Sequence, residues 1–205
     1  MDKPRTLAAD RPRRSAARSE AGRKAVHVAV SVVAACLVLL LSQGAARLLF
    51  ALTTAVALVI DLARLRSAAF RRPFLRAFSA MLRDEELDRL TGATMLSVGF
   101  TLAVCLLPSD YAAAGLFTAG LADPAAAFVG RGYGRVRLPG GKSLEGAAAF
   151  LLVAFVVGVA TTSVGLAGAA IAAAITAMLE AISPRFDDNL YLPIMAGTLL
   201  WILAP

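Results

Sequence analysis

Long apolar stretches separated by short polar segments dominate this chain of 205 residues. A helix needs about 20 mostly apolar residues to span a bilayer. The stretches that approach this length are residues 25–41, 45–62, 92–107, 111–129, 147–163, 165–182 and 189–204. The pattern therefore predicts an all-α fold, a polytopic membrane helical bundle with about seven transmembrane helices.

Two polar segments differ from the loops between the spans. Residues 1–22 are rich in Arg, Ala, Ser and Pro and lack apolar periodicity, which is typical of a disordered tail. We therefore expect a basic cytoplasmic tail at 1–22 and a single integral-membrane catalytic domain at 23–205. The loop 63–91 carries apolar residues near helical spacing with arginines between them. The apolar residues are Phe70, Phe74, Phe78, Met81 and Leu82. This pattern predicts an amphipathic helix at the cytoplasmic membrane interface.

The formal net charge of +7 is explained by topology. If the N-terminus is cytoplasmic, all of the 21 Lys and Arg residues except Arg47 fall on the cytoplasmic side. Such a bias sets orientation in membranes, so we expect a multi-pass protein of the cell inner (plasma) membrane with its C-terminus outside. Nucleic-acid binding is not expected, because no soluble surface interleaves basic and aromatic residues.

The two cysteines, Cys36 and Cys105, both lie in predicted spans. Neither has a neighbouring cysteine or histidine, so we expect small buried apolar residues without a disulfide or a metal. The outside loops are very short, and no internal repeat is visible. Both features argue against a transporter, although a small non-catalytic transporter stays an alternative.

Residues 121–146 combine acids, glycines and cations in one cytoplasmic segment. Asp123 followed by Pro124 predicts the start of a new helix, with an N-cap and a proline in its first turn. Gly130, Gly132 and Gly134 allow positive φ values and bare backbone N–H groups.

Cations and a further acid follow these glycines: Arg131, Arg135, Arg137, Lys142 and Glu145. We expect Ser143 to cap the next helix, whose N-terminus favours anions. Glycines, cations and a carboxylate for Mg²⁺ are what a nucleoside triphosphate site requires. The segment is not a Walker A loop, because Val136 stands where its first glycine belongs. A merely basic turn is the alternative.

A second polar cluster precedes the last span. Glu180 ends one span, and Asp187, Asp188 and Asn189 begin the next. Asp187 or Asp188 can cap that helix, or the adjacent acids and Asn189 can complete a metal site on the same face as Asp123. The sequence leaves both interpretations open.

Several of these motifs together resemble one enzyme family. The spacing Asp123-x-x-Ala126-x-x-x-Gly130-x-x-x-Gly134, followed by Lys142-Ser143-Leu144-Glu145-Gly146, resembles the CTP-binding signature of the polyprenol kinase family. That family includes dolichol, phytol and farnesol kinases and CTP-dependent diacylglycerol kinases. Further pieces fit in the same order, which are Arg23-Lys24-x-x-His27, Leu90–Thr94 and Asp187–Ile194. Ser31 departs from the glycine that many members have after the histidine.

The resemblance implies a CTP-dependent lipid kinase. It would transfer the γ-phosphoryl group of CTP, with Mg²⁺, to the hydroxyl of a membrane isoprenoid alcohol (phytol, farnesol, geranylgeraniol or polyprenol type) or of diacylglycerol. The implied catalytic residues are Asp123, Lys142 and Asp188. The implied CTP-binding residues are Arg23, Lys24, Ala126, Gly130, Gly134, Ser143, Glu145 and Gly146. The implied metal ligands are Asp123, Asp188, Asn189 and Glu145. His27 is either a general base or a residue that only bonds a neighbour.

CDP-diacylglycerol synthase, a cytidylyltransferase, is the nearest enzymatic alternative. It shares an Asp-x-x-Ala…Gly…Glu-Gly signature. Those enzymes also carry a Gly-His-Gly-Gly motif, and the single histidine of this chain is His27. That motif is therefore missing here.

Overall fold

The computed structural model describes residues 13–79, 81–138, 141–182 and 187–205, with side chains from residue 20 onward. The helices are α1 (Arg13–Leu40), α2 (Gln43–Arg66), α3 (Ala68–Phe78), the 3₁₀-helix η1 (Asp84–Leu87), α4 (Gly92–Leu106), α5 (Ser109–Gly132), α6 (Leu144–Thr161), α7 (Leu166–Ile182) and α8 (Asp188–Ile202). No described residue belongs to a β-strand; Arg137 and Ser143 form an isolated bridge. The predicted all-α class is confirmed.

Four of the described helices are long and apolar enough to cross a membrane, which are Glu20–Leu40, Gln43–Arg66, Ser109–Gly132 and Leu144–Thr161. Gly92–Leu106 and Leu166–Ile182 are shorter apolar helices. These lengths agree with a helical membrane bundle. The number of seven spans and the orientation stay predictions.

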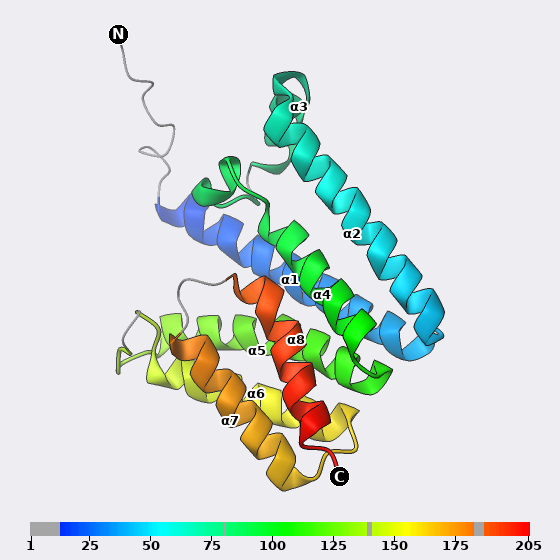
Figure 1. Cartoon of the computed structure of the whole chain (residues 1–205). Coiled ribbons are helices and arrows are strands. Elements are labelled where there is room, and N and C mark those ends of the chain that lie inside the picture. Colours follow the sequence, from blue (N-terminus) through cyan, green and yellow to red (C-terminus); the bar gives the residue numbers. More distant parts are fainter. Residues whose placement is uncertain (1–12, 80, 139–140, 183–186) are drawn as a thin grey trace.

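Helix α5 is the centre of the bundle and packs against α1, α4, α6 and α8 (Figure 1). Its small residues allow these close approaches. A Cβ atom added to Gly115 would collide with the carbonyl of Pro193 in α8, and one added to Gly120 would collide with Ser31 in α1. The small residues of α5 therefore set how closely its neighbours pack.

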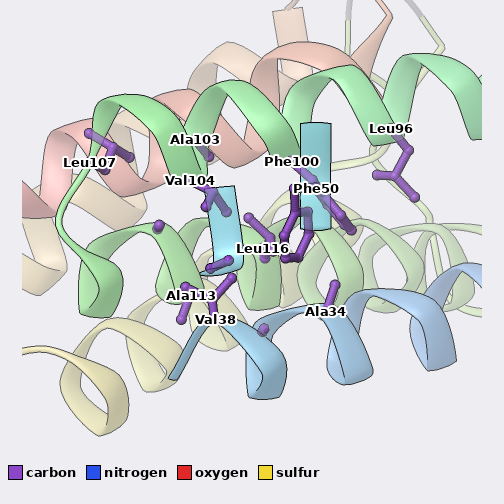
Figure 2. Close-up of a cluster of buried hydrophobic side chains, with 13 residues drawn as sticks. Ala34, Val38, Phe50, Leu96, Phe100, Ala103, Val104, Leu107, Ala113 and Leu116 are labelled. Atoms are coloured by element: carbon purple, nitrogen blue, oxygen red, sulfur yellow. The ribbon is translucent and has the colours of Figure 1, made fainter. Parts of the chain in front are cut away.

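A hydrophobic cluster joins α1, α2, α4 and α5 near the connection between α1 and α2 (Figure 2). Val38, Phe50, Phe100 and Leu116 lie in it and are at most 6% exposed. The rings of Phe50 and Phe100 meet edge to face with their centroids 6.5 Å apart. This cluster fastens the α1–α2 hairpin to the central helix.

The predicted helix start at Asp123 and Pro124 is wrong, because α5 runs continuously from Ser109 to Gly132. A proline inside a membrane helix is tolerated when neighbouring groups satisfy the freed backbone. The carbonyl freed by Pro124 is that of Gly120, and His27 of α1 bonds the neighbouring carbonyl of Ala119 through Nε2, 3.2 Å away.

The positive φ values that Gly130, Gly132 and Gly134 would allow are not adopted. Gly130 and Gly132 lie inside α5, and within the described part of the chain only Gly141 has a positive φ, of 87°. The left-handed residue is thus placed in the turn before α6. The glycines of the motif serve packing instead, as described below.

Three other predictions concern the termini and the surface. Helix α1 begins at Arg13, inside the predicted tail, and residues 1–12 lie outside the described residues. Helix α3 forms where the amphipathic helix is predicted, and none of its residues is buried. Cys36 and Cys105 are free, as predicted, but both are exposed rather than buried.

Candidate functional site

An ion pair joins α1 to α5 at the polar end of the bundle. Lys24 Nζ lies 3.1 Å from Asp123 Oδ2, and the side chains are 17% and 22% exposed. Both groups are therefore shielded but reachable from solvent. His27, one turn along α1, holds the same stretch of α5 through its bond to Ala119. The Arg-Lys-x-x-His segment thus fixes α1 beside Asp123.

A second ion pair joins the turn before α6 to α7. Lys142 Nζ donates to Glu180 Oε1 at 2.5 Å and to the Glu180 carbonyl oxygen at 2.5 Å. The Glu180 side chain is 5% exposed, so its charge is buried and paired. Buried acids at a helix end in a membrane are costly and usually functional.

The two ion pairs lie within electrostatic reach of each other. The negative charges of Asp123 and Asp188 both act on Glu180, and both also act on His27. Direct contacts join Lys24 to Asp123 and Lys142 to Glu180, and the charge of Asp188 acts on this end of the bundle at longer range. The fold closes separations of 99 residues between Lys24 and Asp123 and of 38 residues between Lys142 and Glu180.

The capping alternative for the last cluster is resolved in favour of Asp187. Its Oδ1 accepts the backbone N–H of Asn189 at 3.1 Å, which caps α8. Burial raises the pKa of Asp187 above its ordinary value, and the nearby charge of Asp188 adds to the rise. Asp188 is the first residue of α8 and is half-buried.

The segment between α5 and α6 is held by caps and by Glu145. Ser143 Oγ accepts the N–H of Gly146 at 3.1 Å and caps α6, as predicted. Glu145 accepts the backbone N–H groups of Arg135 at 3.0 Å and Val136 at 3.3 Å. Gly132, Tyr133, Gly134, Arg135 and Glu145 line a hollow of about 440 Å³ beside this segment.

The small residues of the predicted CTP motif lie where α5 crosses α6. A Cβ on Gly146 would lie 2.8 Å from the Ala126 carbonyl oxygen, and one on Gly130 would lie 2.9 Å from Ser143 Oγ. A Cβ on Gly134 would collide with the Gly130 carbonyl. The spacing of the motif is therefore required by helix packing, whatever ligand binds nearby.

A preformed metal cage is not part of the described structure. Among the described residues, no group of three or more His, Cys, Asp or Glu side chains is placed to hold a metal ion. Asp123, Glu145 and Asp188 therefore do not meet as one cluster. Mg²⁺ in phosphoryl-transfer sites usually has one or two carboxylates plus substrate phosphates, so the assignment of Asp123 and Asp188 as its ligands stays a prediction.

The Asn189 side chain lies beside Gly92 and Glu86, at the start of α4, and not beside Asp123. A Cβ on Gly92 would lie 2.9 Å from Asn189 Nδ2 and 3.0 Å from Glu86 Oε1. Glu86 accepts the backbone N–H of Gly92 at 3.2 Å. Asn189 thus links the start of α8 to the start of α4. The charges of Glu86 and Asp123 both act on Arg23 of α1.

The sequence analysis missed a buried network at the end of α2. Asp61 accepts from Arg64 Nε at 2.5 Å, Thr91 N at 2.7 Å and Thr94 Oγ1 at 2.6 Å. Asp61 and Arg64 are each 1% exposed. The sequence did contain a sign of this network, since Asp61 is an acid inside the predicted apolar span 45–62. This network anchors the Leu90–Thr94 segment to α2.

The fold and site together define an all-helical, membrane-type protein whose polar side chains from several helices converge at one end of the bundle. The chain is 33% identical over 109 residues to CTP-dependent diacylglycerol kinase 1 of Eremothecium gossypii. The aligned part is 52% of this chain and 33% of that protein, so the chain matches about a third of the relative's length. No family model matches the chain, and no solved structure matches it.

Proposed function

We propose that this protein is a CTP-dependent lipid kinase, which phosphorylates the hydroxyl of a membrane isoprenoid alcohol or of diacylglycerol. The observation that carries the proposal is that two ion pairs, Lys24–Asp123 and Lys142–Glu180, lie at one end of an apolar bundle, with the charge of Asp188 acting on Glu180. The partial similarity to a CTP-dependent diacylglycerol kinase supports the same reaction.

In the proposed complex, Lys24 and Lys142 exchange their contacts with Asp123 and Glu180 for contacts with the triphosphate. Lys24 and Lys142 would neutralise phosphate oxygens, and Asp123 and Asp188 would hold Mg²⁺, which would supply further positive charge to the phosphates. The N-terminus of α6, capped by Ser143, adds a partial positive charge that favours the anion. Glu145 keeps the segment at 135–136 in place through its backbone bonds and supports the nucleotide from there.

The reaction breaks the bond between the γ-phosphorus and its bridging oxygen and forms a bond to the acceptor oxygen. CDP leaves, and the acceptor proton passes to solvent or to a nearby carboxylate. Mg²⁺, when bound, supplies charge neutralisation on the phosphates. The side chains align donor and acceptor, and this alignment accounts for most of the catalysis in such transfers. His27 positions α5 through Ala119 rather than acting as the base.

The proposed orientation places this polar end in the cytoplasm of a cell with CTP available there. The distribution of Lys and Arg supports it, because nearly all of them lie in segments on the side of the N-terminus. The lipid acceptor then comes from the inner leaflet of the plasma membrane.

The test is transfer of label from γ-labelled CTP to extracted lipid by the purified protein in nanodiscs. Asp123→Asn should lower the rate about 10²- to 10³-fold, as expected for removing one electrostatic group from a transfer site. Asp110→Asn is the matched control, because Asp110 lies at the opposite end of the same helix. It should leave the rate within twofold.

The position of the label also separates the alternatives. Label in the lipid supports the kinase, whereas label in free pyrophosphate would indicate a cytidylyltransferase. Absence of CTP turnover with a panel of phytol, geranylgeraniol, undecaprenol and diacylglycerol would refute the proposal and leave a non-catalytic membrane protein.

A further inference from the structure

A large groove separates α1 from α2. The two helices make few contacts along their length and diverge from their short connection (Figure 1). The space between them has a volume of about 810 Å³ and is bounded by α1, α2, α3 and α4. The hydrophobic cluster of Phe50 and Phe100 closes its narrow end.

The lining of the groove changes from polar to apolar along its length. Arg23, His27, Glu86 and Asn189 line the end near the candidate site. Val30, Val33, Leu37 and Leu49 line the remainder. Val30 is 49% exposed and Val33 is 58% exposed, so the apolar wall faces open space. An amphiphile with one polar end and one long tail matches this gradient.

Two residues that line the polar end are next to residues of the proposed kinase site. His27 and Lys24 share one turn of α1, and Asn189 follows Asp188 in α8. A hydroxyl at this end of the groove therefore lies beside the groups that would hold the triphosphate. The ring of Phe74, stacked on Arg64 at 5.4 Å, lines the groove from α3.

We infer that this groove binds the hydrocarbon tail of the acceptor alcohol and delivers its hydroxyl to the polar end, an inference that rests on the proposed lipid kinase function. The occupant is one chain. A groove of about 810 Å³ with one apolar wall and one polar end suits an alcohol with a single long tail, such as a 20-carbon isoprenoid alcohol.

The first test is photo-cross-linking in nanodiscs with a 20-carbon primary alcohol that carries a diazirine near its tail end. Cross-links, mapped by mass spectrometry, should concentrate on the groove sides of α1 and α2. Val33→Trp should reduce them at least fivefold. Val33 lies about 9 Å along α1 beyond His27, since each helical residue rises about 1.5 Å, and a tryptophan there blocks the deeper half.

Val56→Trp is the matched control. Val56 is 58% exposed, as is Val33, but it does not line the groove. Cross-linking in this variant should equal that of the wild type. Equal labelling of all three proteins, or labels on the outer face of α2, would overturn the inference. Val30→Trp, one turn nearer the polar end, repeats the test if Val33→Trp does not fold.

The second test compares phosphorylation of a 10-carbon and a 20-carbon isoprenoid alcohol. Val33→Trp should lower the ratio of the 20-carbon to the 10-carbon rate at least tenfold, because each buried methylene contributes a factor of about four. An unchanged ratio would refute the groove as the acceptor site while leaving the kinase proposal intact. Cross-linking as expected, without phosphorylation of any alcohol, would instead refute the kinase and leave a lipid-binding groove.

Discussion

The buried network at the end of α2 provides the sharpest test of how the bundle is held together. Asp61 receives hydrogen bonds from Arg64, Thr91 and Thr94, and Arg64 also donates to the carbonyls of Leu87 and Arg89. The network ties α2 to the segment before α4. Because both charges are almost fully buried, neither can recover its lost partner from water.

Asp61→Ala should lower the free energy of unfolding by about 3–5 kcal/mol, the usual cost of leaving one member of a buried ion pair alone. The double substitution Asp61→Ala with Arg64→Met removes both charges. Its effect should be smaller than the sum of the single effects by about 1–3 kcal/mol, because the penalty of an unpaired charge disappears.

The measurement is denaturant unfolding in mixed micelles, followed by far-UV circular dichroism, for the wild type, both single variants and the double variant. Asp110→Ala replaces an exposed acid at the other end of the bundle and should change stability by no more than about 0.5 kcal/mol. Additive effects within about 0.5 kcal/mol, or a cost below about 1 kcal/mol for Asp61→Ala, would refute the coupling inferred from these contacts.

Two further predictions concern the candidate site. Gly134→Ala should destabilise the protein by about 1–3 kcal/mol, because the new Cβ meets the rigid Gly130 carbonyl. Gly132→Ala is the control and should not destabilise it, because a Cβ at Gly132 meets no neighbouring group within 4 Å. Thermal unfolding of both variants measures the difference. Asp187 has a raised pKa in the folded protein, so its contribution to stability is present below its ordinary value of 3.8 and is lost as pH rises through the higher folded value. The stability of Asp187→Asn relative to the wild type should therefore increase over that window and then stay constant at higher pH; a pH-independent difference would contradict the burial of this carboxyl group.

The lengths of the apolar stretches determined the long helices of this protein. A stretch of 15 or more apolar residues buries its backbone polar groups most economically as a helix, and this depends only on local sequence. Each predicted span therefore contains a helix with bounds within four residues of those expected, except that α1 begins at Arg13 rather than at residue 25. The caps at Ser143 and Asp187 were equally local, since a cap bonds N–H groups two or three residues away.

Tertiary packing decided what the sequence analysis left open or got wrong. Pro124 predicts a helix start locally, yet α5 continues through it because neighbouring helices surround that turn. The sequence suggests that Gly130 and Gly134 are flexible loop residues. In the structure, their lack of a Cβ lets the end of α5 pack closely against Ser143, the residue that caps α6. Asp61 gave a signal as an isolated acid, while its partners Thr91 and Thr94 lie about 30 residues away.

The pairing of charges at the polar end also depended on the fold. The sequence determined that acids and cations occupy the same ends of several helices, because the spans alternate in direction. It did not determine that Lys24 faces Asp123 or that Lys142 faces Glu180 rather than a neighbouring acid. Those choices follow from how closely the small residues of α5 let α1 and α6 approach, which is a property of packed surfaces and not of any single segment.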